Sequence, residues 1–327
     1  MSADGRPLPK VKLDRLLYTH YQHQNLESAN KFFTDFGLHI VERRDNIILY
    51  RGFGASSYVY VAEQSPDHVS DAAGHGKFVE LQDRNGVGLT IHHGLLLRSE
   101  EEQKEEIPAP VTINSWNDKP RKGEFHRFDT GPSKVHKLGH YGLVVDKSKF
   151  KDTVAWYLST FGLTKTDSLY DEKSGEDMMT FMHIDKGEEF TDHHSLFIQS
   201  PPPPVPKSYP HHSSFEVDNM DSQLTGHYHL QGKRWTNCWG VGRHLLGSQI
   251  TELDENNKRH PTSLQDELGL TLSTSDGITS DGWVHEQEFL IQLQKDQLET
   301  YRHQNLALRV FLTDRTRSPI RGRARQS

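Results

Sequence analysis

The sequence reads Leu138-Gly-His-Tyr-Gly-Leu-Val-Val-Asp146 at the point that decides the fold. This run of apolar residues ends at a polar turn and predicts a short strand. The segment 150–158 follows with apolar residues at helical spacing, and Thr160-Phe-Gly-Leu163 closes it. Gly162 in that closing phrase is the residue type that takes the left-handed position just past a helix end. The stretch therefore predicts a strand, a turn and an amphipathic helix.

The first half of the chain contains the same pattern. Leu16-Leu-Tyr-Thr-His-Tyr21 is apolar and aromatic, the segment 26–33 has one apolar face, and Asp35-Phe-Gly-Leu38 closes it. The two copies lie about 125 residues apart, a longer spacing than the roughly 20–45 residues of a solenoid repeat. The chain is therefore predicted to consist of two homologous halves.

Strand signals rich in β-branched and aromatic residues follow each predicted helix. They lie at 47–50, 58–61, 88–91, 180–184, 195–198 and 214–217. Their order predicts an α+β fold of two tandem β-α-β-β-β modules that form curved sheets, with the second module incomplete. The predicted boundaries are 12–98 for the first module, 99–135 for a charged and proline-rich linker, 136–250 for the second module and 251–327 for a divergent tail.

Composition excludes several classes of protein. The 327 residues carry 38 basic and 45 acidic side chains, a net charge of −7, which argues against a general nucleic-acid-binding chain. The single cysteine, Cys238, cannot form an intramolecular disulfide, and this fits a reducing compartment. No stretch approaches a membrane span of about 18 apolar residues. The chain is therefore expected to be soluble and cytoplasmic.

Histidine is the outlier of the composition, with 21 residues. Four of them stand out in the second half, in or beside strand signals or in a glycine-rich phrase: His140, His194, His212 and His244. Any one of them alone is better explained as a surface residue or a hydrogen-bonded core residue. Two imidazoles on different strands of one curved sheet can instead converge on a metal ion, because the neutral ring nitrogen is a good ligand for iron, zinc or nickel.

Four phrases surround these histidines. They are Leu138–Leu143, Asp192–Phe197, His211–Val217 and Trp239–Ile250. In this order and spacing, they resemble the type I extradiol ring-cleaving dioxygenases of the vicinal oxygen chelate (glyoxalase/bleomycin resistance/dioxygenase) superfamily, particularly its fungal catechol-dioxygenase-like branch. Tyr21-Gln-His23 and Asp35-Phe-Gly-Leu38 resemble the N-terminal module of the same enzymes. The resemblance extends from about residue 12 to residue 250.

The resemblance implies a mononuclear Fe(II) site in the second module, with Mn(II) as the alternative ion. It implies that His140 and His212 are metal ligands, that His194 is the acid/base group beside the O₂ position, and that His244 hydrogen-bonds the substrate. The implied reaction is Fe(II)- and O₂-dependent ring cleavage of a catechol-type aromatic diol, as in aromatic compound catabolism. The implied partners are the diol and O₂, with no nucleic acid and no membrane, and homo-oligomer formation is left open.

The resemblance ends after Ile250. Leu253 stands where the family has a tyrosine, and Ser263 stands where it has the third metal ligand, a glutamate. The nearby carboxylates are Glu255, Asp266 and Glu267. Neither role can therefore be carried over to Leu253 or Ser263. The three carboxylates are disfavoured candidates for the ligand, because a shift of a few residues along a strand changes the depth or the face of a side chain.

Two hypotheses account for this departure. The segment after Ile250 is either the product of a shifted reading frame, a retained intron or a gene rearrangement, or a genuine divergent end in a binding relative without catalysis. Under both, metal affinity falls and the second sheet is left with an open edge. The tail is predicted to be partly helical over 284–309 and disordered over its basic end, 315–326.

Two other functions stay open beside the dioxygenase. One is a non-catalytic module that binds an aromatic ligand or a partner. The other is a glyoxalase-type lyase on the same fold, which is disfavoured because residues 16–91 show no matching pair of histidine and glutamate. The pocket of the first half is expected to be vestigial, with His20 and His23 in structural or surface positions.

Overall fold

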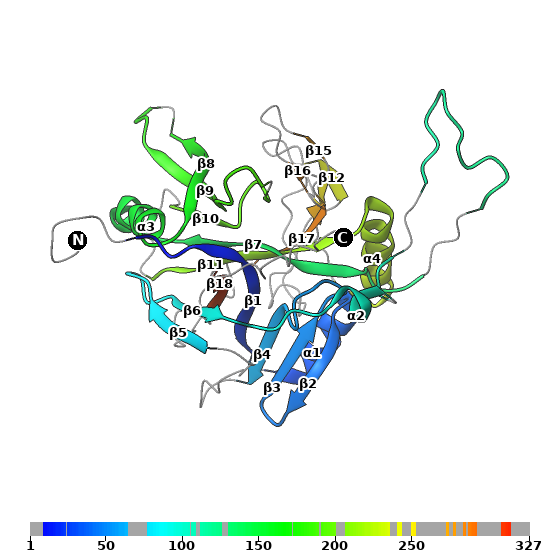
Figure 1. Ribbon diagram of the computed structural model, residues 1–327, viewed down its shortest axis with the longest axis horizontal. Coiled ribbons are helices and arrows are strands. Elements are labelled where there is room, and N and C mark those ends of the chain that lie inside the picture. Colours follow the sequence, from blue (N-terminus) through cyan, green and yellow to red (C-terminus); the bar gives the residue numbers. More distant parts are fainter. Residues whose placement is uncertain are drawn as a thin grey trace, which may run out of the picture.

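The computed structural model describes residues 9–23, 25–64, 77–104, 106–108, 112–125, 130–171, 173–189, 191–200, 207–235, 241–243, 250–252, 273–274, 277–278, 284–285, 287–292 and 309–314. Within these ranges the chain forms two large mixed sheets, and helices pack against them (Figure 1). No helix in this part of the chain is both long and apolar enough to cross a membrane.

The first sheet combines strands of the first half with one strand of the tail. Its elements are β1 (Leu13–His23), α1 (Leu26–Phe36), β2 (His39–Arg44), β3 (Ile47–Arg51), β4 (Tyr60–Gln64), β5 (Lys77–Gln82), β6 (Gly88–His93) and β18 (Arg309–Asp314). The strand order is β2-β3-β4-β1-β18-β6-β5. A short helix, α2 (Glu100–Lys104), follows β6.

The second sheet carries most of the histidine phrases. Its elements are β7 (Val135–Val144), α3 (Lys147–Thr160), β8 (Leu163–Tyr170), β9 (Asp177–Ile184), β10 (Leu196–Gln199), β11 (Tyr209–Val217), α4 (Met220–Gly232) and β17 (Gln287–Gln292). The strand order is β17-β11-β7-β10-β9-β8. Two small sheets contain β12 (Val241–Arg243), β13 (Ile250–Glu252), β14 (Ser273–Thr274), β15 (Gly277–Ile278) and β16 (Val284–His285).

The two large sheets repeat one arrangement. In the first, the chain order β1-α1-β2-β3-β4 gives the spatial order β2-β3-β4-β1, with β1 parallel to β4. In the second, the chain order β7-α3-β8-β9-β10 gives the spatial order β8-β9-β10-β7, with β7 parallel to β10. The predicted α+β fold of two β-α-β-β-β modules is confirmed.

Capping explains where the module helices begin. The side chain of Asn25 accepts a hydrogen bond from the Ser28 N–H, and the side chain of Asp146 accepts one from the Ser148 N–H, both at 2.9 Å. At its other end, α1 stops at Gly37, which has a φ of 117°. A Cβ at Gly37 would lie 1.9 Å from the Ser133 carbonyl oxygen. Only glycine therefore fits this helix end.

Gly162 does not take the left-handed conformation that the sequence predicts for it. Helix α3 ends instead with Phe161 in an extended conformation. The Gly162 N–H donates to the Val11 carbonyl at 2.7 Å, and the Val11 N–H donates to the Thr160 carbonyl at 2.8 Å. Pairing with the segment before β1 therefore keeps the chain extended where local sequence predicts a turn.

The tail differs from the prediction where the structure describes it. Residues 287–292 form strand β17 rather than part of a helix, and β17 pairs with β11 in an antiparallel register. The expectation of an open edge at β11 is therefore wrong. Strand β18 lies between β1 and β6, although the sequence places 309–314 outside the first module. The basic end, 315–326, lies outside the described residues.

Buried contacts join the two halves. Phe36 of α1 and Phe215 of β11 meet edge to face, with ring centroids 6.0 Å apart. The Tyr21 hydroxyl of β1 lies 2.7 Å from the Ser213 hydroxyl of β11. All four side chains are buried. Because β11 also carries His212, contacts with the first half help to position the histidine site.

Candidate functional site

Two histidines singled out by the sequence face each other on neighbouring strands of the second sheet. His140 lies in β7 and His212 in β11, which pair in an antiparallel register. Their Nε2 atoms are 2.8 Å apart, and their ring centroids are 5.0 Å apart. The register shifts in β11 between Pro210 and Ser213, which bracket His212. His140 is only 2% exposed, whereas His212 is partly exposed.

His194 lies beside this pair, in the segment between β9 and β10. Its ring centroid is 4.0 Å from that of His140. Backbone hydrogen bonds of Ser195 with β9 and β7, at 2.8 and 3.2 Å, anchor the segment. The Thr166 hydroxyl of β8 donates to the His193 carbonyl at 2.7 Å. Three strands therefore hold His194 next to His140.

The Phe197 ring forms a wall of this site. It lies against Gly142, where a Cβ would meet the ring at 2.0 Å, so only glycine lets the ring approach the backbone of β7. The ring centroid of Phe197 is 4.9 Å from that of His212 and 5.7 Å from that of Phe181. Phe181 in turn meets His194 at 5.0 Å. The histidines are therefore set among aromatic side chains.

Burial keeps two neighbouring histidines neutral. It lowers the pKa of His211 to about 4, with the nearby His140 as the second cause. Burial also lowers the pKa of His183, against the opposing effect of Asp185. Burial therefore disfavours positive charge on the imidazoles of His211 and His183. A neutral imidazole keeps a lone pair on one ring nitrogen, and this is the form that binds a metal ion.

The separation of His140 and His212 fits two ligands of one divalent ion. Two nitrogens that each lie about 2.1 Å from an ion, at right angles, are about 3 Å apart; the observed distance is 2.8 Å. The described residues contain no cluster of three or more His, Cys, Asp or Glu side chains placed to hold a metal ion. By register, Gln292 of β17 lies opposite His212. Outside the described residues lie His244, Leu253, Glu255, Ser263, Asp266 and Glu267.

A buried pair in the first half was not found from the sequence. His20 Nε2 lies 3.1 Å from Glu63 Oε2 on the parallel strands β1 and β4, and the two side chains are 3% and 0% exposed. The expectation that residues 16–91 lack a histidine and glutamate pair is therefore wrong. His23 is buried too, with Nε2 2.9 Å from the Tyr60 hydroxyl, so neither histidine lies on the surface. The only sequence signal for the pair is that each residue lies in or next to a predicted strand.

Comparison with solved structures identifies the fold. A Mn(II)-bound glyoxalase from Novosphingobium aromaticivorans is similar with a TM-score of 0.53 and 14% identity, over 93% of this chain and 83% of that chain. Homoprotocatechuate 2,3-dioxygenase from Brevibacterium fuscum, in complex with 3,4-dihydroxyphenylacetate, is similar with a TM-score of 0.55 and 16% identity, over 77% and 80%. This chain has the vicinal oxygen chelate fold. The 2,3-dioxygenase LapB from Pseudomonas sp. KL28 is also similar, with a TM-score of 0.54 and 10% identity, over 93% of each chain.

At sequence identities of 10–16%, the similarity to solved structures shows the fold of this chain but not its function. The sequence matches no protein-family model and no curated protein. The similar structures include both dioxygenases and a glyoxalase, and one vicinal oxygen chelate fold therefore serves different reactions. The function of this chain has to be argued from its own site residues.

Proposed function

We propose that the chain is an extradiol-dioxygenase-like protein that holds a divalent metal ion at His140 and His212 and cleaves the ring of a catechol-type aromatic diol with O₂. Fe(II) is the proposed ion, with Mn(II) as the alternative. The proposed relatives are the fungal catechol-dioxygenase-like enzymes, and the proposed location is the cytoplasm. The observation that carries the proposal is the 2.8 Å separation of the two Nε2 atoms. The fold shared with extradiol dioxygenases supports it.

A divalent ion bound to this pair would supply electron transfer between a chelated diol and O₂. The side chains around it have separate tasks. His194, beside His140, is proposed to exchange a proton with the reacting oxygen atoms and to stabilise negative charge there. Phe197 excludes water and offers an aromatic face to the ring of the diol. His244 is proposed to hydrogen-bond the substrate hydroxylate.

The second candidate function is a non-catalytic module that binds an aromatic ligand. The observation that favours it is the lining by Phe181 and Phe197, which would contact a ring with or without a complete metal site. In this case, the segment after Ile250 is a genuine divergent end. A glyoxalase-type lyase stays less favoured, although the His20–Glu63 pair removes one argument against it.

The test is reconstitution of the purified full-length protein with Fe(II) under anaerobic conditions. Bound iron, O₂ uptake and the yellow ring-opened product of catechol are then measured. The proposal expects about one iron per chain in the wild type and loss of this iron in His140→Ala and His212→Ala. His93→Ala is the matched control, because His93 is exposed at the end of β6 in the other sheet.

The outcomes separate the two functions. Iron binding without O₂ uptake above the buffer rate would favour the binding module. Iron retained in both His140→Ala and His212→Ala would exclude the proposed site. His194→Gln should keep its iron but turn over about 100-fold or more slowly, which is the usual effect of losing an acid/base group.

A further inference from the structure

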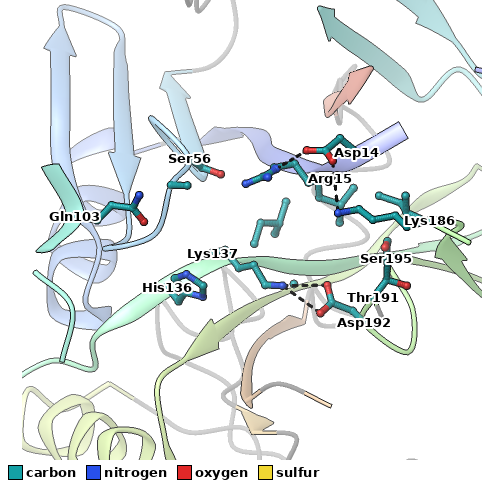
Figure 2. A pocket seen from close by; sticks show the side chains of 15 residues that line it. Asp14, Arg15, Ser56, Gln103, His136, Lys137, Lys186, Thr191, Asp192 and Ser195 are labelled. Atoms are coloured by element: carbon teal, nitrogen blue, oxygen red, sulfur yellow. Dashed lines mark hydrogen bonds and ion pairs between the residues drawn. The ribbon is translucent and has the colours of Figure 1, made fainter. Parts of the chain in front are cut away.

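A cavity of about 330 Å³ lies between the two halves, apart from the histidine site. This volume is in the range of sites for small molecules. Its walls come from the start of β1, residues 55–56, α2, the start of β7, and five residues at the end of β9 and before β10: Ile184, Lys186, Thr191, Asp192 and Ser195 (Figure 2). The residues that line it do not include His140, His194 or His212.

Basic side chains outnumber acidic ones in the lining of this cavity. The cations are Arg15, Lys137 and Lys186, and the anions are Asp14 and Asp192. Lys137 contacts both carboxylate oxygens of Asp192, at 3.1 and 3.2 Å. Lys186 lies 3.5 Å from Asp14. Lys137 also contacts Glu216, at 3.1 Å, and Lys186 also contacts Glu189, at 3.2 Å. Both lysines are therefore paired with carboxylates, and Arg15 is the cation of the lining with donors left for an anionic occupant.

Arg15 has hydrogen-bond donors that face this cavity. Its Nε donates to Asp14 at 2.9 Å, and among the described residues its two terminal amino groups make no hydrogen bond. Figure 2 shows the guanidinium extending across the cavity toward the side on which Ser56 lies. Two parallel N–H groups of a guanidinium match the two oxygens of a carboxylate.

Thr191 is an independent sign of a ligand. Its hydroxyl oxygen is buried and has no hydrogen-bond partner among the described residues. A buried hydroxyl without a partner destabilises a protein, so such a group usually bonds to water or to a ligand. Leu16, Leu138 and Ile184 supply apolar walls. The cavity therefore suits a molecule with an apolar body and polar groups at its ends.

We propose that this cavity binds a small organic carboxylate that carries a second polar group, such as a hydroxyl. The carboxylate accepts hydrogen bonds from the terminal amino groups of Arg15. The apolar body contacts the walls, and the second polar group pairs with the Thr191 hydroxyl. This site requires no metal ion and does not depend on the proposed function.

The test is isothermal titration calorimetry of the full-length protein with 3-hydroxybenzoate. The neutral analogue 3-hydroxybenzyl alcohol and inorganic phosphate serve as comparison ligands. We expect one saturable site for 3-hydroxybenzoate, and no binding of the other two at the same concentrations. Arg15→Gln should weaken binding about tenfold or more, since it removes a charged hydrogen-bond donor pair. Arg84→Gln, which changes an exposed arginine outside the cavity, should leave the affinity unchanged.

Thr191→Val is the second variant, because it removes the buried hydroxyl with little change of shape. Without ligand, its unfolding temperature should equal or exceed that of the wild type, whereas its affinity for 3-hydroxybenzoate should fall several-fold. His140→Ala should bind the acid as the wild type does. Unchanged affinity in Arg15→Gln or Thr191→Val, loss of binding in His140→Ala, or equal binding of the neutral alcohol would overturn the proposal.

Discussion

Replacing Gly142 by alanine tests how the aromatic wall is held. The new methyl group would lie 2.0 Å from Cζ and 2.3 Å from Cε1 of Phe197. Carbon atoms that are not bonded prefer about 3.5 Å or more, so the ring would have to withdraw by about 1.5 Å. The rings of Phe181, His211 and His212 oppose this movement, with centroids 5.7, 5.2 and 4.9 Å from that of Phe197.

Overpacking of this kind destabilises a protein by about 1–3 kcal/mol. We expect Gly142→Ala to lose this much free energy of unfolding in urea denaturation. It should also bind Fe(II) more weakly, because the displaced Phe197 ring presses on His212. Combining it with Phe197→Leu should recover part of the stability, since the smaller side chain leaves room for the methyl group. Gly232→Ala is the control, because a Cβ there meets no atom within 4 Å.

The outcome that would refute this reasoning is a Gly142→Ala protein with the stability and the metal affinity of the wild type. Equal losses of stability in Gly142→Ala and Gly232→Ala would also refute it, because only Gly142→Ala places a methyl group against a ring. A loss of stability that Phe197→Leu does not relieve would also count against the contact between Phe197 and Gly142.

Two further predictions concern the buried histidines of the first half. Glu63→Gln should lower the free energy of unfolding by about 1–3 kcal/mol in urea denaturation, because the buried His20 loses a charged partner. Glu27→Gln, which changes an exposed ion pair, should have little effect, and equal losses in the two variants would contradict the prediction. Burial, with a smaller contribution from His20, lowers the pKa of His23 to about 3. As the pH falls, His23 of the unfolded chain takes up a proton near pH 6.5, whereas His23 of the folded chain does so only near pH 3. The free energy of unfolding should therefore fall by up to about 1.4 kcal/mol for each pH unit between pH 6.5 and 3. His23→Gln should show a shallower slope in the same pH series, and an unchanged slope would assign the effect to other groups.

The sequence locates strands whose side chains are buried better than those that lie at edges. Residues 47–50 and 180–184 are runs of β-branched and aromatic residues, and they form parts of β3 and β9. Strand β2 was not predicted, because His39–Arg44 is mostly polar and fully exposed at the edge of its sheet. Helix α4 was not predicted either, since its buried residues include Gln223 and Gly226 and form no apolar stripe.

The other differences between prediction and structure arise where segments far apart in the sequence pair with each other. The segment 284–309 was expected to be helical, but it contains three consecutive apolar residues at 289–291. Such a run suits a strand as well as a helix. In the structure these residues pair with β11 and form a strand. His20 and Glu63 are 43 positions apart, and nothing in their spacing shows that β1 and β4 are neighbours. The resemblance of their phrases predicted His140 and His212 as metal ligands, whereas the 2.8 Å between their Nε2 atoms depends on the register of β7 and β11.

The position of β18 has a consequence for how the chain folds during synthesis. Residues 309–314 lie between β1 and β6, so the sheet whose other strands are all made early receives one of its central strands after some 300 residues have been translated. Until then, β1 and β6 would leave the ribosome with unpaired edges, which invite pairing with other nascent chains. Closing this sheet joins segments far apart in sequence, a slow step in folding. We therefore expect chaperone contact with the first half to last until translation is nearly finished.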